Sequence, residues 1–324
     1  MNFITARSPV FLMIGDHMQH TLNDIVKISG IGLHSGKAAN LVVQPAGVDF
    51  GIVFKRIDVS DKDNVVKALW SNVVDTRLCT LIGNKSGVTI GTIEHLMAAL
   101  RAFGIDNALI QIDGPEVPIL DGSSKEFIQA FDKVGSFEQV SPRRAIRVLK
   151  TITYKDADKT VSLSPSITPT YAGQIEYNHP SIGTQRFEMK LVNGNFKHDV
   201  ADCRTFCLLS DVELMQQNGL ALGGSLDNAI VVDDAGIMNE DGLRCADEFI
   251  RHKILDAVGD IALAGGLVLG HYEGNKIGHD MNNKLLHALF ADDTAWEYVD
   301  LLVNPESSDE ALYETAAPAV AHAH

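Results

Sequence analysis

Residues 246–264 read ADEFIRHKILDAVGDIALA, and the spacing of their apolar positions predicts one long helix. Acidic and histidine side chains recur at every fourth position and form one stripe along it: Glu248, His252, Asp256 and Asp260. The simplest interpretation of such a stripe is a solvated polar face with pairing between successive turns. The alternative is a metal site, because a His and an Asp one turn apart can both reach a single ion. Two ligands are too few for a zinc site, so the alternative needs a third from elsewhere.

Strand and helix patterns occur on both sides of residues 135–144, a polar stretch with Pro142 that is the best candidate for a domain linker. Before it, the sequence predicts strands at 39–43, 51–56, 88–90 and 108–112, and helices at 93–104 and after residue 124. After it, the sequence predicts strands at 145–148, 160–163, 173–177, 228–232 and 267–271, and helices after residue 210, at 246–264 and at 282–291. Each half ends on helices, which favours two layered α+β domains over one doubly wound sheet.

Composition limits the class of protein. The 324 residues include 27 Lys and Arg against 42 Asp and Glu, a formal net charge of −15, which argues against a nucleic-acid partner. No apolar run approaches the roughly 18 residues of a transmembrane segment, and no signal peptide is evident, so we expect a cytoplasmic protein. The four cysteines form no C-x-x-C pair, which favours reduced thiols over a disulfide framework or a thiolate zinc site.

The third ligand is expected from Glu94-His95, at the start of the helix at 93–104. A carboxylate adjacent to a ligand histidine is placed to take a proton from water at a zinc site. Taken alone, the pair is better explained by a surface Glu favoured by the helix dipole beside a half-buried His. His279 precedes a helix and is equally explained by a polar, Asn-capped turn.

The glycines at 30–36 fit no phosphate-loop pattern and are expected to form a turn that also lines a pocket.

In combination, these segments resemble one family from about residue 28 to residue 297, the UDP-3-O-acyl-N-acetylglucosamine deacetylases of lipid A biosynthesis. The matching motifs, in order, are GIGLHSG at 30–36, TIEHL at 92–96, PILDGS at 118–123, YNHP at 177–180, RTF at 204–206, the run at 239–260 with RHKILD at 251–256, GH at 278–279 and NKL at 283–285. Each motif is weak alone, whereas the ordered set is specific.

The resemblance implies the fold and its boundaries. It implies an α+β two-layer sandwich of two similar domains, each with a sheet packed on two helices, and the active site between them. We expect a variable leader at 1–20, domain I at 21–140, domain II at 141–304 and a mobile tail at 305–324. A β-α-β insert at about 207–236 is expected to form an apolar passage for an acyl chain, with these wall residues: Leu208, Leu209, Leu214, Met215, Leu220 and Leu222.

The resemblance also implies the site residues. His95, His252 and Asp256 are the expected ligands of Zn²⁺, with Fe²⁺ as the alternative ion in the cell. The expected catalytic residues are Glu94 as the general base, His279 as the catalytic histidine, Asp260 as the carboxylate that orients it, and Thr205 beside the oxyanion. The expected substrate-binding residues are Lys253, Lys159, Lys276, Tyr177 and Phe206. Three of these are lysines, so a local basic cluster is expected inside an acidic protein.

The implied activity is hydrolysis of the N-acetyl group of a UDP-3-O-acyl-N-acetylglucosamine, which releases acetate. Zinc would activate water and polarise the carbonyl, Glu94 would take the proton, and a protonated His279 would stabilise the oxyanion. The implied partner is this nucleotide-sugar lipid, with a transient contact to the inner membrane, no nucleic acid, and a monomeric enzyme. Two alternatives remain: a zinc amidohydrolase for another N-acetylated sugar, and a catalytically silent protein with a structural metal.

Overall fold

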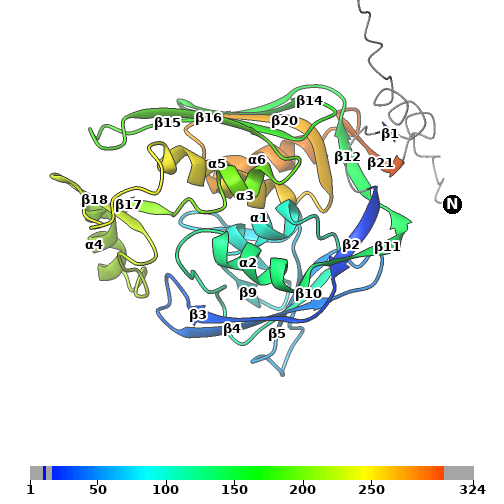
Figure 1. Cartoon of the computed structure of the whole chain (residues 1–324), viewed down its shortest axis with the longest axis horizontal. Helices are drawn as coiled ribbons and strands as arrows, with labels where there is room; N and C mark the ends of the chain where they lie inside the picture. The colour runs from blue at the N-terminus through cyan, green and yellow to red at the C-terminus, as the bar shows by residue number, and fades with distance from the viewer. Residues whose placement is uncertain (1–9, 12–16, 303–324) are drawn as a thin grey trace, which may run out of the picture.

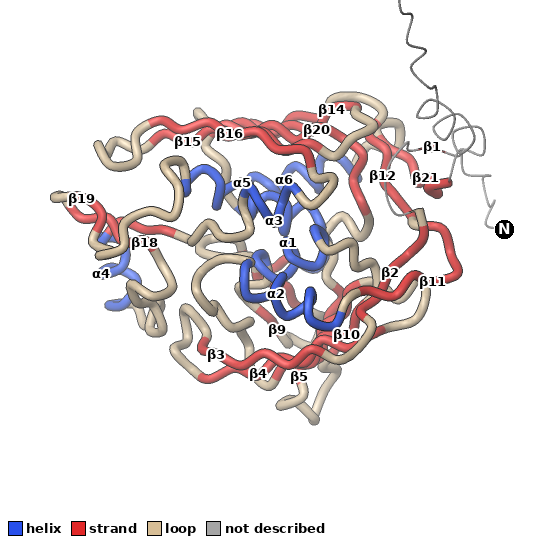
Figure 2. The backbone as a smooth tube through the Cα atoms, viewed as in Figure 1, coloured by secondary structure: helices blue, strands red, loops and turns tan. Residues whose placement is uncertain are grey.

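The protein has an α+β fold, as expected, in the computed structural model, which describes residues Val10–Phe11 and 17–302. Two sheets form the outer layers, and helices fill the space between them (Figure 1, Figure 2). The expected tail at 305–324 and most of the expected leader at 1–20 lie outside the described residues.

The first sheet is built by residues before the expected linker. Its strand order is β3 (Val26–Ile31), β4 (Ala38–Pro45), β10 (Ala108–Ile112), β5 (Ile52–Arg56) and β6 (Val65–Lys67). All neighbours are antiparallel except β10 and β5. Alternate residues of β4, such as Leu41 and Val43, face inward and are fully buried. They belong to one core with α1 (Glu94–Ala102) and α2 (Lys125–Val134), which lie on the inner side of the sheet (Figure 1).

The second sheet is built mainly by residues after the expected linker. Its path is β1 (Val10–Phe11), β21 (Trp296–Leu302), β12 (Arg144–Val148), β20 (Leu267–Asn275), β14 (Lys159–Pro165) and β13 (Ile152–Asp156). Strand β15 (Thr170–Glu176) pairs in parallel with β20 and carries β16 (Thr184–Lys190) on its other edge. The inner side of this second sheet is covered by α5 (Glu248–Ala262) and α6 (His279–Phe290), and the short α3 (Asn195–Asp199) lies beside these helices (Figure 2).

The two helical layers meet where α5 packs on α1. The contact is backbone to backbone, because a Cβ built on Gly259 would lie only 2.0 Å from the carbonyl oxygen of Glu94. Helix α5 is buried along most of its length, including the predicted polar stripe, and only Arg251 and Lys253 are partly exposed. The solvated-face interpretation of Glu248, His252, Asp256 and Asp260 is therefore wrong, since all of them lie in the interior.

Two small sheets flank the centre. The first is antiparallel and contains β7 (Val73–Asp75), β8 (Leu81–Gly83) and β9 (Thr89–Ile90), preceded by the 3-10 turn at Trp70–Asn72. The second is the β-α-β unit expected near 207–236: β17 (Phe206–Leu208), α4 (Leu209–Gln217) and β18 (Ile230–Asp233), with β17 and β18 parallel and β19 (Gly236–Ile237) on the far edge.

The stretch at 135–144 differs from the expected irregular linker. Most of it forms β11 (Ser136–Pro142), which pairs with β2 (Met18–Leu22), a strand that begins inside the range assigned to the leader. The pairing keeps a bulge between Glu138 and Pro142, where the proline cannot donate to a regular ladder. Three consecutive residues of β11, Ser136, Phe137 and Glu138, are exposed, so both faces of this ribbon reach the surface.

Candidate active site

Three buried side chains form a cluster of metal-ligand type. One ligand atom from each of His95, His252 and Asp256 lies within 4.8 Å of the other two, and within the described residues no other set of three His, Cys, Asp or Glu does so. His252 and Asp256 stand one turn apart on α5, whereas His95 comes from the first turn of α1. Both imidazole Nε2 atoms approach the same carboxylate oxygen, Oδ1 of Asp256, at 3.4 and 3.3 Å.

The geometry of this cluster fits a bound cation. The Nδ1 of His252 lies 3.0 Å from the carbonyl oxygen of Cys203, so Nδ1 carries the hydrogen and Nε2 presents a lone pair. Burial lowers the pKa of His252 to about 3, which keeps this imidazole neutral. Oδ1 of Asp256 is buried and has no hydrogen-bond donor. Converging lone pairs without a donor suit a metal ion, and two nitrogens with one oxygen form the donor set of a catalytic zinc site with an open position.

Three further charged side chains, Glu94, Asp260 and His279, lie beside the metal-ligand cluster. The Nδ1 of His279, the first residue of α6, is 2.8 Å from Oδ2 of Asp260, and its Nε2 is 3.7 Å from Oε1 of Glu94. Burial opposes the charged form of His279, but Asp260 and Glu94 outweigh it and raise the pKa to about 9. Burial raises the pKa of Glu94, although His279 and His95 oppose the shift. The site thus combines a carboxylate more basic than an ordinary Glu with a positively charged imidazole.

Asp260 is held in place by three donors. Besides His279, it accepts hydrogen bonds from the Asn282 side-chain amide at 2.9 Å and from the Thr80 hydroxyl at 2.5 Å. The expected capping role of an Asn at this helix is wrong for Asn282, because Gly278 precedes the first helical residue and Asn282 points to Asp260. Thr80 was not predicted at all, since it lies in a stretch without periodicity.

A cavity of about 710 Å³ extends from this site to the β-α-β unit. Its polar wall contains most of the predicted non-metal site residues: Lys159, Tyr177, Thr205, Phe206, Lys253, Lys276 and His279. Its apolar wall includes four of the six predicted passage residues, which are Leu208, Leu209, Leu214 and Met215. Leu220 lines a neighbouring cavity of about 530 Å³ together with His34 and Ser35 of the glycine-rich turn. Leu222 is exposed and lines neither cavity.

The basic residues of the cavity differ in their surroundings. The ammonium of Lys253 lies 3.0 Å from Oδ2 of Asp256 and 5.6 Å from the centre of the Phe206 ring. Lys276 pairs with Asp158 and, at 3.3 Å, with Glu176. The Tyr177 and Phe206 rings meet edge to face at 5.5 Å. Lys253 therefore lies closest to the metal-ligand cluster, while Lys276 is shared with two carboxylates at the rim.

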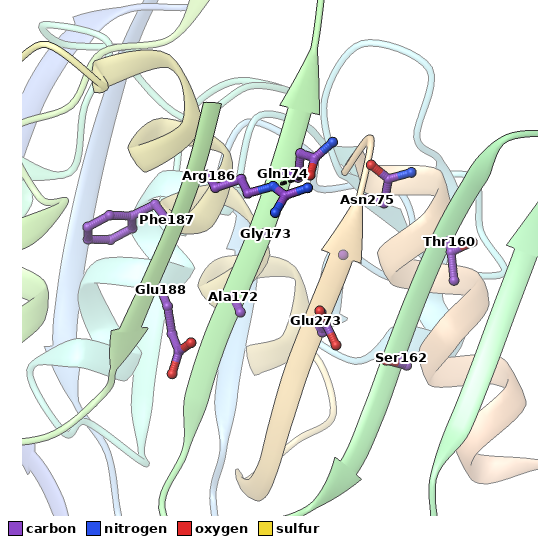
Figure 3. A pocket seen from close by; sticks show the side chains of 11 residues that line it. Thr160, Ser162, Ala172, Gly173, Gln174, Arg186, Phe187, Glu188, Glu273 and Asn275 are labelled. Carbon is purple, nitrogen blue, oxygen red and sulfur yellow. Dashed lines mark hydrogen bonds between the residues drawn. The ribbon is translucent and has the colours of Figure 1, made fainter. Parts of the chain in front are cut away.

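A larger hollow, of about 810 Å³, lies on the second sheet and contains none of the predicted site residues. Figure 3 shows its side chains in two rows across four strands, Thr160, Asn275, Gln174 and Arg186 in one and Ser162, Glu273, Ala172 and Glu188 in the other. Arg186 donates to Gln174 within the first row. This face has no metal-ligand cluster, so cavity size alone does not locate the site.

Glu248 is the member of the α5 stripe that does not join the site. Its carboxylate accepts hydrogen bonds from the backbone and guanidinium of Arg204 and from the backbone of Arg244. This buried ion pair holds the segment that leads to Thr205 against the start of α5.

None of the helices in the described ranges has the length and apolarity that crossing a bilayer requires.

Comparison with known proteins agrees with this geometry. The family model described as UDP-3-O-acyl N-acetylglycosamine deacetylase matches residues 19–291. A UDP-3-O-acyl-N-acetylglucosamine deacetylase of Phenylobacterium zucineum (strain HLK1) is 45% identical over 278 residues, covering 86% of this chain and 95% of its own length. Proteins with the same name from Syntrophotalea carbinolica, 46% identical, and Haemophilus ducreyi, 45% identical, each cover 87% of this chain and 91% and 92% of their own lengths. The chain therefore belongs to the UDP-3-O-acyl N-acetylglycosamine deacetylase family.

Proposed function

We propose that the protein hydrolyses the N-acetyl group of UDP-3-O-acyl-N-acetylglucosamine and releases acetate and UDP-3-O-acyl-glucosamine, the committed step of lipid A biosynthesis. The observation that carries the proposal is the position of the His95, His252 and Asp256 cluster. The cluster lies beside the Glu94 carboxylate, whose pKa is raised, and the positively charged imidazole of His279. It is close to a cavity that has lysines on one wall and apolar side chains on the other. Each part matches one group of this substrate: the amide, the diphosphate and the acyl chain.

The proposed metal is Zn²⁺, held by His95, His252 and Asp256, with Fe²⁺ as the alternative in the cell. When bound, the ion would supply Lewis acidity, which lowers the pKa of water and polarises an amide carbonyl. The carbonyl oxygen of Cys203 fixes the His252 ring for this role. Three protein ligands rather than four support a catalytic site over a purely structural one.

Glu94 and His279 carry the proton chemistry in this proposal. Glu94, whose pKa is raised by burial, takes a proton from the attacking water as the new carbon–oxygen bond forms. The positive charge of His279 and the Thr205 hydroxyl stabilise the oxyanion of the tetrahedral intermediate. When the carbon–nitrogen bond breaks, the proton passes to the leaving amine, and Asp260 keeps His279 oriented through Nδ1.

The substrate head group is assigned to the polar wall of the cavity. Lys253, Lys159 and Lys276 would face the diphosphate, and Tyr177 and Phe206 would contact the nucleotide-sugar. The acyl chain would follow Leu208, Leu209 and Met215 into the β-α-β unit. This division explains how an acidic protein binds an anionic substrate, because the cationic groups are gathered at one cavity.

The test combines the metal content of the purified protein with acetate release from the UDP-3-O-acyl-GlcNAc substrate. Glu94→Gln is expected to keep near-stoichiometric metal and lose at least about 100-fold in kcat, because only the base is removed. His252→Ala is expected to lose the metal as well as turnover. Wild-type activity in Glu94→Gln would contradict the role of the base, and a full complement of metal in a triple His95, His252 and Asp256 alanine variant would contradict the ligand set.

A second candidate is an amidohydrolase for another N-acetylated sugar. It is favoured by one observation, the pairing of Lys276 with Asp158 and Glu176, which competes with a diphosphate for this ammonium. Assays with substrates that lack the UDP group or the acyl chain separate the two candidates. Loss of activity with each truncated substrate supports the first, and unchanged kcat/KM supports the second.

We further propose a monomeric cytoplasmic enzyme with two domains, at 21–140 and 141–304, that contacts the inner membrane transiently. The division is supported by the two sheets, each of which draws most of its strands from one side of residue 142. Sedimentation velocity tests the monomer, and separation of membrane and soluble fractions tests the location.

A further inference from the structure

Thr80 lies between the two carboxylates of the proposed proton chemistry. It precedes β8 and is 2% exposed. Its backbone N–H donates to Oε2 of Glu94 at 3.1 Å, and its hydroxyl donates to Oδ1 of Asp260 at 2.5 Å. Among the hydrogen bonds of the described residues, no other residue joins these two side chains. One residue from the small sheet thus connects the first turn of α1 with the last turn of α5.

The two hydrogen bonds fix which oxygen of each carboxylate is available. In Glu94, Oε2 is held by Thr80, and Oε1 is the oxygen that lies 3.7 Å from Nε2 of His279. In Asp260, Oδ1 is held by Thr80, and Oδ2 accepts from Nδ1 of His279. A carboxylate held at one oxygen cannot rotate about its last torsion without breaking a hydrogen bond to a charged group. Thr80 therefore helps to orient Glu94 and Asp260 together, while Asn282 also donates to Oδ2 of Asp260.

We infer that Thr80 is a positioning residue. It fixes the orientation of the carboxylate of the base Glu94 relative to the carboxylate of Asp260, the partner of His279. The inference rests on the proposed function for the roles of these groups. Thr80 itself is absent from the walls of both cavities beside the site, so its effect is exerted through its two partners. Loss of a hydrogen bond to a charged group corresponds to a fall of about 10- to 100-fold in a rate that depends on it.

Thr80→Val removes the hydroxyl and keeps both the shape of the side chain and the backbone N–H. We expect kcat for acetate release to fall about 10- to 100-fold, with KM within about twofold of wild type and unchanged metal content. Thr80→Ser restores the hydroxyl and is expected to recover most of kcat. If Thr80→Val does not fold, Thr80→Ala replaces it, because a smaller side chain removes the same hydroxyl without overpacking.

Thr21→Val is the matched control. Thr21 is also buried, and its hydroxyl donates to the carbonyl oxygen of Asn107 at 2.7 Å, away from the site. Thr80→Val loses one hydrogen bond, and Thr21→Val loses two, because the Thr21 hydroxyl also accepts from the backbone N–H of Ala46 at 3.0 Å. Both variants are therefore expected to lower the melting temperature. A purely structural role of Thr80 would make the two variants alike in kcat. The proposal requires that only Thr80→Val lowers kcat.

A second measurement does not depend on turnover. In protein labelled with ¹⁵N-histidine, the ring signals of His279, assigned by their loss in His279→Gln, are expected to shift in Thr80→Val and to stay unchanged in Thr80→Ser and Thr21→Val. Wild-type kcat or unshifted His279 signals in Thr80→Val, or a Thr80→Ser variant as impaired as Thr80→Val, would overturn the inference. Failure of the wild-type protein to release acetate would instead refute the proposed function. The His279 signals would still test whether Thr80 controls the surroundings of His279.

Discussion

At the scale of single residues, the site works through charge states that burial and neighbours set together. The pKa of His252 falls to about 3 and that of His279 rises to about 9, although both imidazoles are buried. The difference lies in their neighbours, because Asp260 and Glu94 outweigh burial at His279, whereas burial, His95 and Lys253 outweigh Asp256 at His252. One histidine is thereby suited to bind a cation and the other to carry a positive charge.

The raised pKa of His279 predicts the alkaline limb of the pH profile. Asp260 and Asp256 face it from α5 and Glu94 from α1, and together they keep it protonated up to a pKa of about 9. Because the charged form is proposed to stabilise the oxyanion, kcat is expected to be high below this pH and to fall as pH rises through it. His279→Gln should lower kcat and abolish the limb. The limb should persist in the control His287→Gln, since His287 packs on Trp70. An unchanged limb in His279→Gln would refute the assignment.

Removal of the metal is expected to lower stability, because the lone pairs of His95, His252 and Asp256 then converge without a cation. Adding Zn²⁺ at about 100 times its Kd should stabilise the metal-free protein by about 2.7 kcal/mol. The melting temperature measured with and without a chelator checks this. Glu94→Gln should show the same shift as wild type, whereas His252→Ala should show none. Equal shifts in all three proteins would place the ion elsewhere.

The sequence predicts those site residues whose relation is local. The spacing of four places His252 and Asp256 on one face of a helix, and Glu94 and His95 are adjacent. Thr80 could not be found in this way, because Glu94 and Asp260 lie 14 and 180 residues away from it and its own stretch has no periodic pattern. The same holds for Cys203, which contributes only a backbone carbonyl that any residue could supply.

At the scale of secondary structure, two helices approach each other very closely beside the site. Helices α1 and α5 approach so closely at Gly259 that a methyl group there would overlap the backbone of Glu94. Because the obstacle is backbone, a flexible side chain cannot move away to relieve it. The same contact sets the distance between His95 on α1 and His252 on α5.

Gly259→Ala is therefore expected to separate α1 from α5. We predict a loss of about 1–3 kcal/mol in the free energy of unfolding, from overpacking, together with weaker metal binding. Urea denaturation and metal titration measure the two effects. Gly47→Ala is the control, because nothing lies within 4 Å of the added Cβ at that position. Wild-type metal affinity in Gly259→Ala would show that the helix spacing does not control the site.

The elements that the sequence predicts are those with a periodic apolar pattern, such as β10, α1 and α5. Two of the strands that it misses, β16 and β13, lack this pattern. In β16, a single residue of seven, Met189, is buried, and in β13 none is. Polar edge strands are set by hydrogen bonding to a neighbour, which composition does not reveal. The solvated-face interpretation of the α5 stripe fails for a related reason, because the spacing of the four residues does not reveal what packs against them.

At the scale of the whole molecule, an ion-pair network far from the cavity holds the two halves together. Asp106 accepts from the Arg143 guanidinium at 2.9 Å and from the backbone N–H of His20 at 3.0 Å, and its other oxygen lies 3.6 Å from Arg101. These partners belong to the end of β11, to β2 and to α1. Burial lowers the pKa of Arg101, which shows the cost of keeping this guanidinium charged in the interior.

Asp106→Asn is expected to lower the free energy of unfolding by about 3 kcal/mol, because two buried guanidinium groups lose their shared counter-charge. Differential scanning calorimetry and urea denaturation check the loss. The metal content should be unchanged, since no ligand is touched. The control is Asp132→Asn, which removes an exposed pair with Lys197 and should cost less than about 1 kcal/mol. Equal losses in the two variants would argue against a special role of Asp106.

The division of the ligands between α1 and α5 has a consequence for the order of events during synthesis. His95 leaves the ribosome about 150 residues before His252 and Asp256, which at ordinary translation speed is roughly ten seconds or more. A nascent chain thus carries a lone histidine and no competent site for most of its synthesis. Metal loading has to wait until Asp256 has been made, and a chain that has taken up its ion has already brought its early and late segments together.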